Sequence, residues 1–230
     1  MIMTKTLTSP ILFDIDKTLF DTPGFTQDLL IQVDNLLNRF AVVDLTAEEL
    51  FNQYLYTLKQ TSHFRIEDLI RFSLKKLSQY PIAESDLRQL ETLVFEHLEK
   101  DFLYPEVKTV VHQLDQAGFE LGIFSQSHDP TFQRLKVKPI AHYFNPALIF
   151  ISEAKTDSTF LKQLPLQATI IDDKPEVVLA LFDFAQKNNR NWQIFLIDRY
   201  QLVKPQIEKK LKRLGIKTIN SLKDLIGGSV

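Results

Sequence analysis

The spacing of apolar residues changes twice along this chain of 230 residues. A short apolar run covers 11–13, and from about 25 to 100 the apolar residues then recur every three or four positions. That period is typical of amphipathic helices, whereas the remainder of the chain alternates short apolar runs with helical stretches. The pattern therefore predicts one strand, a block of helices, and then a series of alternating strands and helices.

The block from Phe25 to about Lys100 predicts four helices joined by short connections, as in a small bundle. Thr46 and Glu49 have the spacing of a capping box, which predicts the start of the second helix. The third helix is expected over 66–77, ending before Pro81, and the fourth from Asp86 to about Lys100. We expect Thr22-Pro23-Gly24, just before the block, to form a turn.

The second part of the chain predicts a parallel sheet. Strands are expected at 119–124, 147–151, 168–171 and 193–197, with helices at 105–117, 131–136, 157–164, 176–187 and 205–214. Strands that alternate with helices pair through right-handed crossovers. The first strand, Ile11–Phe13, has no neighbour near it in the chain, so it must join this later sheet. We therefore expect a doubly wound, Rossmann-like α/β core formed by residues 1–22 and 103–230, with residues 23–102 inserted as a helical domain.

Polar side chains directly follow several of the expected strands. Asp14 and Asp16 lie two residues apart, which places both on the same side of an extended segment. Two like charges this close require either a bound cation or unequal protonation. The polar residues after the later strands are Ser125, Lys155, Asp172 and Asp173. Because the carboxyl ends of parallel strands meet in one crevice, we expect these groups to converge there.

Four carboxylates in one crevice suit a hard cation with oxygen ligands, and Mg²⁺ fits best because it binds through a few carboxylates, water and phosphate. Taken singly, each residue has an ordinary structural explanation. Asp172 and Asp173, for example, could cap the helix that is expected to begin near Glu176. An Asp-x-Asp pair also holds a metal-bound nucleotide sugar in some glycosyltransferases, but nothing later in this chain supports that interpretation.

Composition limits the class of protein further. A net charge of −2 argues against a general binder of nucleic acid or of membrane surfaces. The absence of cysteine excludes disulfides, thiolate catalysis and Cys-ligated zinc. No signal-type stretch or membrane-spanning run is present, so we expect a soluble, cytoplasmic protein without nucleic-acid or membrane partners. The oligomeric state is left open.

Four short motifs follow one another in order at the strand ends. The first is Asp14-Ile15-Asp16-Lys17-Thr18, the second a strand ending at Ser125, the third Lys155, and the fourth the pair Asp172-Asp173. This series resembles that of the haloacid dehalogenase-like (HAD-like) superfamily of phosphohydrolases. The helical insertion after the first motif resembles the helical cap of that family. Lys17 departs from the pattern, because glycine is frequent at this position of the motif.

The resemblance implies a role for each residue. Asp14 would be the nucleophile that forms an aspartyl-phosphate, and Asp16 the general acid and base. Ser125 and Lys155 would bind the oxygens of the transferred phosphoryl group. Mg²⁺ would be held by Asp14, the backbone carbonyl of Asp16, and Asp173, with Asp172 binding directly or through water. Family members that dehalogenate carbon substrates lack the second acid, so Asp16 favours phosphoryl transfer.

The sequence therefore predicts a Mg²⁺-dependent phosphatase that acts on a small phosphorylated metabolite. Two alternatives remain: a phosphomutase using the same intermediate, and a non-catalytic regulatory or binding protein that keeps the fold. The cap is expected to close over the site, with hinges near Pro23-Gly24 and near Asp101-Phe102. Lys59, His63 and Arg65 of the cap are candidates for contacts with the substrate, but the sequence does not distinguish them from ordinary surface residues.

Overall fold

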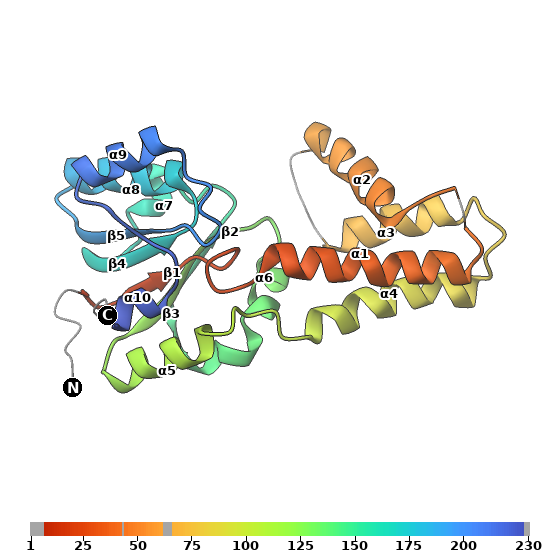
Figure 1. Cartoon of the computed structure of the whole chain (residues 1–230), viewed down its shortest axis with the longest axis horizontal. Coiled ribbons are helices and arrows are strands. Elements are labelled where there is room, and N and C mark those ends of the chain that lie inside the picture. Colours follow the sequence, from red (N-terminus) through yellow and green to blue (C-terminus); the bar gives the residue numbers. More distant parts are fainter. Residues whose placement is uncertain (1–6, 43, 62–65, 228–230) are drawn as a thin grey trace. The chain divides into compact units, whose positions relative to one another are not determined.

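The computed structural model describes residues 7–42, 44–61 and 66–227. These residues form two compact units (Figure 1). The α/β unit contains the chain up to Asp21, Leu103–Ser127, and the chain from Val137 onward. The helical unit contains Thr22–Phe102 together with His128–Lys136, so that it includes one short segment from the later part of the chain. The expected division into domains at residues 22 and 102 stays a prediction.

The α/β unit is built on one six-stranded parallel sheet, as predicted. Its strands are β1 (Ile11–Phe13), β2 (Leu121–Gln126), β3 (Phe144–Ser152), β4 (Gln167–Asp172), β5 (Asn191–Ile197) and β6 (Lys217–Ile219). They lie in the order β3-β2-β1-β4-β5-β6, and each neighbouring pair is parallel. The first strand therefore joins the later sheet near its middle, and the helical insertion separates β1 from β2 in the sequence. The short strand β6 is an element that the apolar pattern does not predict.

Helices cover both faces of this sheet. The helical elements of the unit are α5 (Val107–Gln116), the 3-10 helix η1 (Lys138–Tyr143), α7 (Ser158–Leu161), α8 (Pro175–Lys187), α9 (Pro205–Arg213) and α10 (Lys223–Ile226). Helices α7, α8 and α9 lie on one face, and α5 and α10 lie on the other (Figure 1). The central strand β1 is fully buried between them. Apolar strands enclosed by helices in this way are typical of doubly wound folds.

Close packing of β2 against its neighbours explains one glycine. A Cβ atom at Gly122 would lie 2.5 Å from the carbonyl oxygen of Leu148 and 2.7 Å from the side chain of Leu12. Both distances are far shorter than a real carbon contact allows. The strands β1, β2 and β3 can therefore approach one another as they do only without a side chain at this position.

The helical unit contains four long helices and one short one: α1 (Thr22–Arg39), α2 (Ala47–Thr61), α3 (Ile66–Leu77), α4 (Glu84–Glu99) and α6 (Pro130–Lys136). Helix α1 packs against α2 and α4, and α3 packs against the same two helices. The predicted capping box is confirmed, because the backbone N–H of Glu49 donates to Thr46 Oγ1 at 3.1 Å and that of Thr46 donates to Glu49 Oε2 at 2.9 Å. The four predicted helices are therefore present, and α6 packs against α4.

The predicted turn at Thr22-Pro23-Gly24 is wrong, because these residues form the first turn of α1. Proline is tolerated there, since the first N–H groups of a helix have no partner within it.

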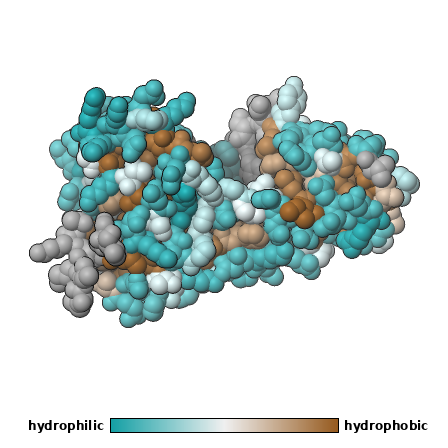
Figure 2. Space-filling model, in the orientation of Figure 1, coloured by the Kyte–Doolittle hydropathy of each residue, from teal (hydrophilic) through white to brown (hydrophobic). Residues whose placement is uncertain are grey.

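The predicted substrate contacts of the cap lie outside the described part of the chain. Neither His63 nor Arg65 belongs to the described residues, and the side chain of Lys59 is likewise outside them. Hydrophilic residues cover much of the face seen in Figure 2. Among the described residues, no helix combines the length and the apolar character needed to cross a membrane.

Candidate active site

Strand register brings the predicted site residues to one edge of the sheet. Phe13 at the end of β1 lies beside Ile171 of β4, so Asp14 and Asp172 follow at the same level. The backbone N–H of Asp14 extends the ladder by donating to the Ile171 carbonyl at 2.9 Å. On the other side of β1, strand β2 delivers Ser125 near its own end. Parallel pairing therefore converts three distant segments into one cluster, as expected from the sequence.

Asp14 is the centre of this cluster. Only 3% of the residue is exposed, and its Oδ1 atom accepts two hydrogen bonds. The Ser125 hydroxyl donates at 3.1 Å, and the Lys155 ammonium donates at 2.8 Å. These donors fix the orientation of the carboxylate. Ser125 and Lys155 are thus both in direct contact with Asp14, as their positions at the strand ends indicate.

Lys155 reaches the site from the loop that follows β3. The residue is 1% exposed, and its Nζ atom lies 2.5 Å from Asp172 Oδ2 as well as 2.8 Å from Asp14 Oδ1. Burial by itself would lower the pKa of Lys155, but the charges of Asp14 and Asp172 outweigh burial and raise it. Lys155 is therefore a buried cation that offsets part of the negative charge around it. The Gln126 side chain steadies its loop by donating to the Glu153 carbonyl at 2.7 Å.

Asp14, Asp172 and Asp173 form a group of carboxylates that fits a metal ion. Each offers one ligand atom, and these three atoms lie within 4.8 Å of one another. Burial, together with the neighbouring carboxylates, raises the pKa of Asp173 to about 7. Burial is also the main cause that raises the pKa of Asp172 to about 6, although Lys155 opposes it. Asp173 Oδ1 is buried without a hydrogen-bond partner, a shortage that an oxygen-preferring cation would satisfy.

The alternative role of the paired aspartates as helix caps is wrong. The N-cap of α8 is Lys174, and no side chain caps this helix. Asp172 Oδ1 instead accepts from the backbone N–H of Lys174 at 2.9 Å, which fixes the turn between β4 and the helix. Both carboxylates are therefore directed to the cluster around Asp14 by the turn rather than to the helix end.

Asp16 stands apart from the three clustered carboxylates. It is partly exposed in the turn after β1, and its backbone forms an isolated bridge with Phe20. The group of candidate ligands formed by side-chain oxygens does not include it within the described part of the chain. Its expected roles as general acid and base, and as a metal ligand through its backbone carbonyl, stay predictions.

Comparison with known proteins gives a match at the level of structure. No family model matches the sequence, and no curated protein matches it. Among solved structures, the HAD-hydrolase YfnB from Bacillus subtilis, crystallised with magnesium, matches with a TM-score of 0.57 and 16% identity, over 96% of this chain and 97% of that one. A HAD phosphatase from Thermococcus onnurineus matches with a TM-score of 0.58 and 18% identity, over 96% of this chain and 99% of the other.

The fold is also similar to that of the L-2-haloacid dehalogenase RSc1362, with a TM-score of 0.55, 15% identity, and coverage of 96% of this chain and 98% of that one. These likenesses run through nearly the full length of each chain. The chain has the fold of the HAD-like hydrolases. Because that fold carries both phosphatases and dehalogenases, the chemistry of this chain has to be argued from its own residues.

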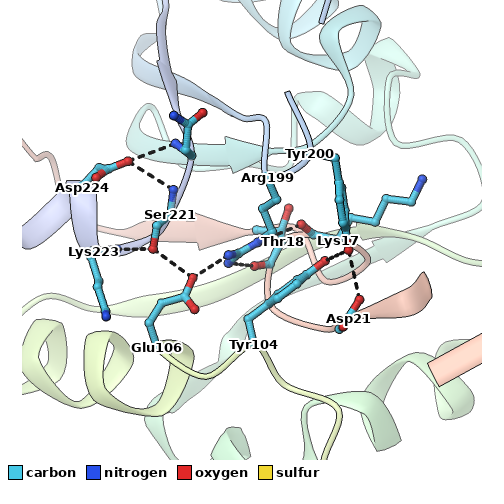
Figure 3. Close-up of polar contacts among 11 residues, drawn as sticks. Lys17, Thr18, Asp21, Tyr104, Glu106, Arg199, Tyr200, Ser221, Lys223 and Asp224 are labelled. Atoms are coloured by element: carbon cyan, nitrogen blue, oxygen red, sulfur yellow. Dashed lines mark hydrogen bonds and ion pairs between the residues drawn. The ribbon is translucent and has the colours of Figure 1, made fainter. Parts of the chain in front are cut away.

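The HAD-like core contains one further group of polar residues, centred on Arg199, that the sequence motifs do not predict. Arg199 follows β5 and contacts the turn after Asp16, together with Tyr104, Glu106 and Tyr200 (Figure 3). The signal was present in the sequence, since Asp198-Arg199-Tyr200 is a run of polar residues directly after a predicted strand. It lies at the same edge of the sheet as the other strand-end residues.

A cavity of about 280 Å³ opens beside the acidic cluster of the HAD-like core. Its lining includes Lys17, Asp173, Arg199 and Tyr200, together with apolar side chains such as Ile197 and Leu202. The Lys17 side chain is exposed, and no hydrogen bond or ion pair holds its ammonium group among the residues described. The Lys17 ammonium therefore lies at the same cavity as Asp173, one of the three clustered carboxylates.

Proposed function

We propose that this chain is a Mg²⁺-dependent phosphatase that hydrolyses a small phosphorylated metabolite through an aspartyl-phosphate on Asp14. The supporting observation is the constellation around Asp14. A buried carboxylate contacts a hydroxyl and a buried ammonium, and it lies beside two further carboxylates that fit a cation. Phosphoryl transfer needs a positioned nucleophile together with cations that offset the negative charge of the phosphoryl group, and this site offers both.

In the proposed reaction, a carboxylate oxygen of Asp14 attacks phosphorus, and the bond from phosphorus to the leaving oxygen breaks. Asp16 gives its proton to that oxygen and later takes one from the water that hydrolyses the aspartyl-phosphate. Ser125 and Lys155, which now donate to Asp14 Oδ1, would also donate to phosphoryl oxygens. Asp14, Asp172 and Asp173 would hold Mg²⁺, which supplies charge neutralisation at the phosphoryl group.

The presence of Asp16 favours a phosphatase over a dehalogenase. An alkoxide is a poor leaving group and needs a proton as the phosphorus–oxygen bond breaks, whereas a halide leaves without one. The resemblance of the motifs implies the same choice, because dehalogenating members lack this acid. The free cation of Lys17 beside the cavity is a second feature that suits a doubly charged substrate.

The test measures phosphate release from an aryl phosphate and from a panel of phosphorylated metabolites, with Mg²⁺ or with a chelator. We expect turnover that needs Mg²⁺ and falls by at least about 10³-fold in Asp14→Asn, since an amide cannot act as the nucleophile. Asp183→Asn, which changes an exposed carboxylate on α8, serves as the control and keeps full activity. Halide release from 2-haloacids without any phosphate release would overturn the proposal.

Asp16→Asn tests the division of labour between the two aspartates. Loss of the general acid should slow hydrolysis of alkyl phosphates much more than hydrolysis of aryl phosphates, because a phenolate leaves readily without a proton. We expect the ratio of aryl to alkyl kcat/KM, which reports the steps through release of the leaving group, to rise by at least about 10-fold relative to wild type. An equal loss of kcat/KM on both substrates would contradict the role of Asp16 as general acid.

A further inference from the structure

The turn that follows Asp16 has a strained backbone. Lys17 has a φ angle of 56°, in the left-handed region that a residue with a Cβ atom adopts at a cost of about 1 kcal/mol. The turn is closed by its own hydrogen bonds, since the N–H of Lys17 donates to the Phe20 carbonyl at 2.8 Å and the N–H of Thr18 donates to the Ile15 carbonyl at 3.2 Å. A strained conformation persists only where its surroundings hold it in place.

Arg199 supplies that support from the end of β5 (Figure 3). Its Nε atom donates to the Lys17 carbonyl at 3.1 Å, and its Nη2 atom donates to the Thr18 carbonyl at 2.6 Å. The guanidinium group lies 3.7 Å from the centre of the Tyr104 ring, which fixes its plane. Two donors of a rigid fork thus hold two successive carbonyl groups, which lie immediately after Asp16.

Arg199 is itself fixed by a buried ion pair. Its Nη1 atom donates to Glu106 Oε1 at 2.5 Å, and the Ser221 hydroxyl donates to the same oxygen at 3.1 Å. Both charged side chains are only 8% exposed. Burial alone would raise the pKa of Glu106, but the hydrogen bonds from Arg199 and Ser221 and the charge of Arg199 hold it below its usual range. All three guanidinium nitrogens therefore donate to protein groups, which identifies Arg199 as a support rather than a ligand for anions.

A second contact from the same loop holds the end of the turn. The Tyr200 hydroxyl donates to Asp21 Oδ1 at 3.1 Å and lies 2.8 Å from the Tyr104 hydroxyl. The loop after β5 is in turn fixed by Asp198, whose carboxylate accepts from the backbone N–H groups of Leu202 and Val203 at 2.9 and 3.0 Å. Arg199 and Tyr200 thus hold both ends of the segment from Lys17 to Asp21.

We infer that Arg199 is a positioning residue that holds the Lys17–Thr18 turn and thereby sets the positions of Asp14 and Asp16. The turn directly follows Asp16, and its first residue, Lys17, is three residues after Asp14, so its displacement would move the proposed nucleophile and acid relative to each other. A misplacement of about 1 Å can cost about 10²-fold in rate. The expected effect on turnover rests on the proposed function, whereas the effect on the turn does not.

The test compares Arg199→Met with Arg190→Met as a matched control. Arg190 also donates to two backbone carbonyls, those of Leu164 and Lys162, and lies over an aromatic ring, that of Trp192. It belongs to the same unit but makes no described contact with the site. Hydrogen exchange over residues 14–21 and the separate values of kcat and KM are measured for both variants.

In Arg199→Met we expect exchange over residues 14–21 to accelerate by at least about 10-fold, and kcat to fall about 30- to 100-fold with KM changed less than about 3-fold. Arg199→Lys should recover part of both losses, because an ammonium can reach one carbonyl but lacks the fork. Arg190→Met should change neither quantity. If Arg199→Met does not fold, Arg199→Lys is compared with Arg190→Met in its place.

Two outcomes separate this inference from the proposed function. Unchanged exchange over residues 14–21 in the Arg199 variants would overturn the inference, whatever the activity. The inference would also be overturned if kcat fell no more in Arg199→Met than in Arg190→Met. If the wild type releases no phosphate but the Arg199 variants show accelerated exchange, the role of Arg199 in holding the turn is supported and only the proposed function is overturned.

Discussion

At the scale of single residues, the structure gives a physical meaning to Lys17, the departure that the motif comparison left unexplained. The position requires a positive φ angle, which glycine adopts without cost and lysine does not. Arg199 stabilises this strained conformation, because it donates a hydrogen bond to the carbonyl of Lys17. In exchange, the chain gains an exposed cation beside the acidic cluster, where a glycine would offer no charge.

Lys155 provides a prediction at the same scale. Its ammonium is buried between Asp14 and Asp172, so Lys155→Met leaves two buried carboxylates without their counter-charge. We expect the free energy of unfolding to fall by about 3 kcal/mol, as for other broken buried pairs. Excess Mg²⁺ should restore part of this loss, since it replaces the missing positive charge. Urea unfolding in chelator and in Mg²⁺ measures both values.

Lys187→Met, which changes an exposed lysine at the end of α8, is the control for this experiment. It should alter the unfolding free energy by less than about 0.5 kcal/mol under either condition. If Mg²⁺ leaves the loss in Lys155→Met unchanged, the three carboxylates do not share a cation as the cluster indicates.

At the scale of elements, the sequence predicts what continuous apolar runs and helical periods can reveal. Strands β1 to β5 were found because each is apolar and bounded by turn residues. The strand β6 was missed, since Lys217-Thr218-Ile219 is short and mostly polar. The sequence predicts a turn at the start of α1 because Pro23 and Gly24 favour turns, but proline is also favoured in the first turn of a helix, where these residues lie.

The candidate site likewise contains residues that local sequence patterns predict and one that they do not. Asp14, Ser125, Lys155, Asp172 and Asp173 could be predicted because each follows an apolar strand and matches a motif. Arg199 could not be assigned a partner, because its contacts with Glu106 and with the turn at Lys17 join segments 93 and 182 residues apart. Such pairings depend on side-chain geometry across the sheet edge, which no local pattern encodes.

A pH dependence of stability is predicted for the pair α1 and α4. His97 of α4 is 1% exposed, and its Nε2 atom lies 3.0 Å from the Phe25 carbonyl of α1. Burial lowers the pKa of His97, with a contribution from Lys100, although the Phe25 carbonyl and Asp28 oppose this. Below about pH 6.5 His97 therefore binds more protons in the unfolded chain than in the folded chain, so its contribution to the free energy of unfolding decreases as the pH falls.

Urea unfolding followed by circular dichroism at pH 7.5 and pH 5.5 measures this effect. In His97→Gln the amide can still donate to the Phe25 carbonyl but does not titrate, so the variant should lose less stability than wild type, or gain more, when the pH is lowered from 7.5 to 5.5. His142→Gln, at an exposed position, should keep the wild-type dependence. An equal change in stability between the two pH values in His97→Gln and wild type would show that His97 does not contribute to the pH dependence.

At the scale of the whole molecule, every proposed metal ligand and every contact of Arg199 belongs to the α/β unit. The chain leaves this unit after Asp21 and returns at Leu103, so the helical unit is inserted a few residues after Asp14, the proposed nucleophile. A ligand bound by the three carboxylates stabilises the segments that carry them. Its effect on the helical unit depends on how strongly the two units unfold together.

This arrangement gives a prediction for Mg²⁺. At 100 times its dissociation constant, a ligand of the folded state adds about 2.7 kcal/mol to the stability of the unit that binds it. We expect Mg²⁺ to slow hydrogen exchange in β1, β4 and the turns after them, and to leave residues 66–99 nearly unchanged. Asp173→Asn should abolish the protection, because it removes the carboxylate whose buried oxygen has no protein partner. Equal protection of both units would show that they unfold as one, and protection that persists in Asp173→Asn would place the cation elsewhere.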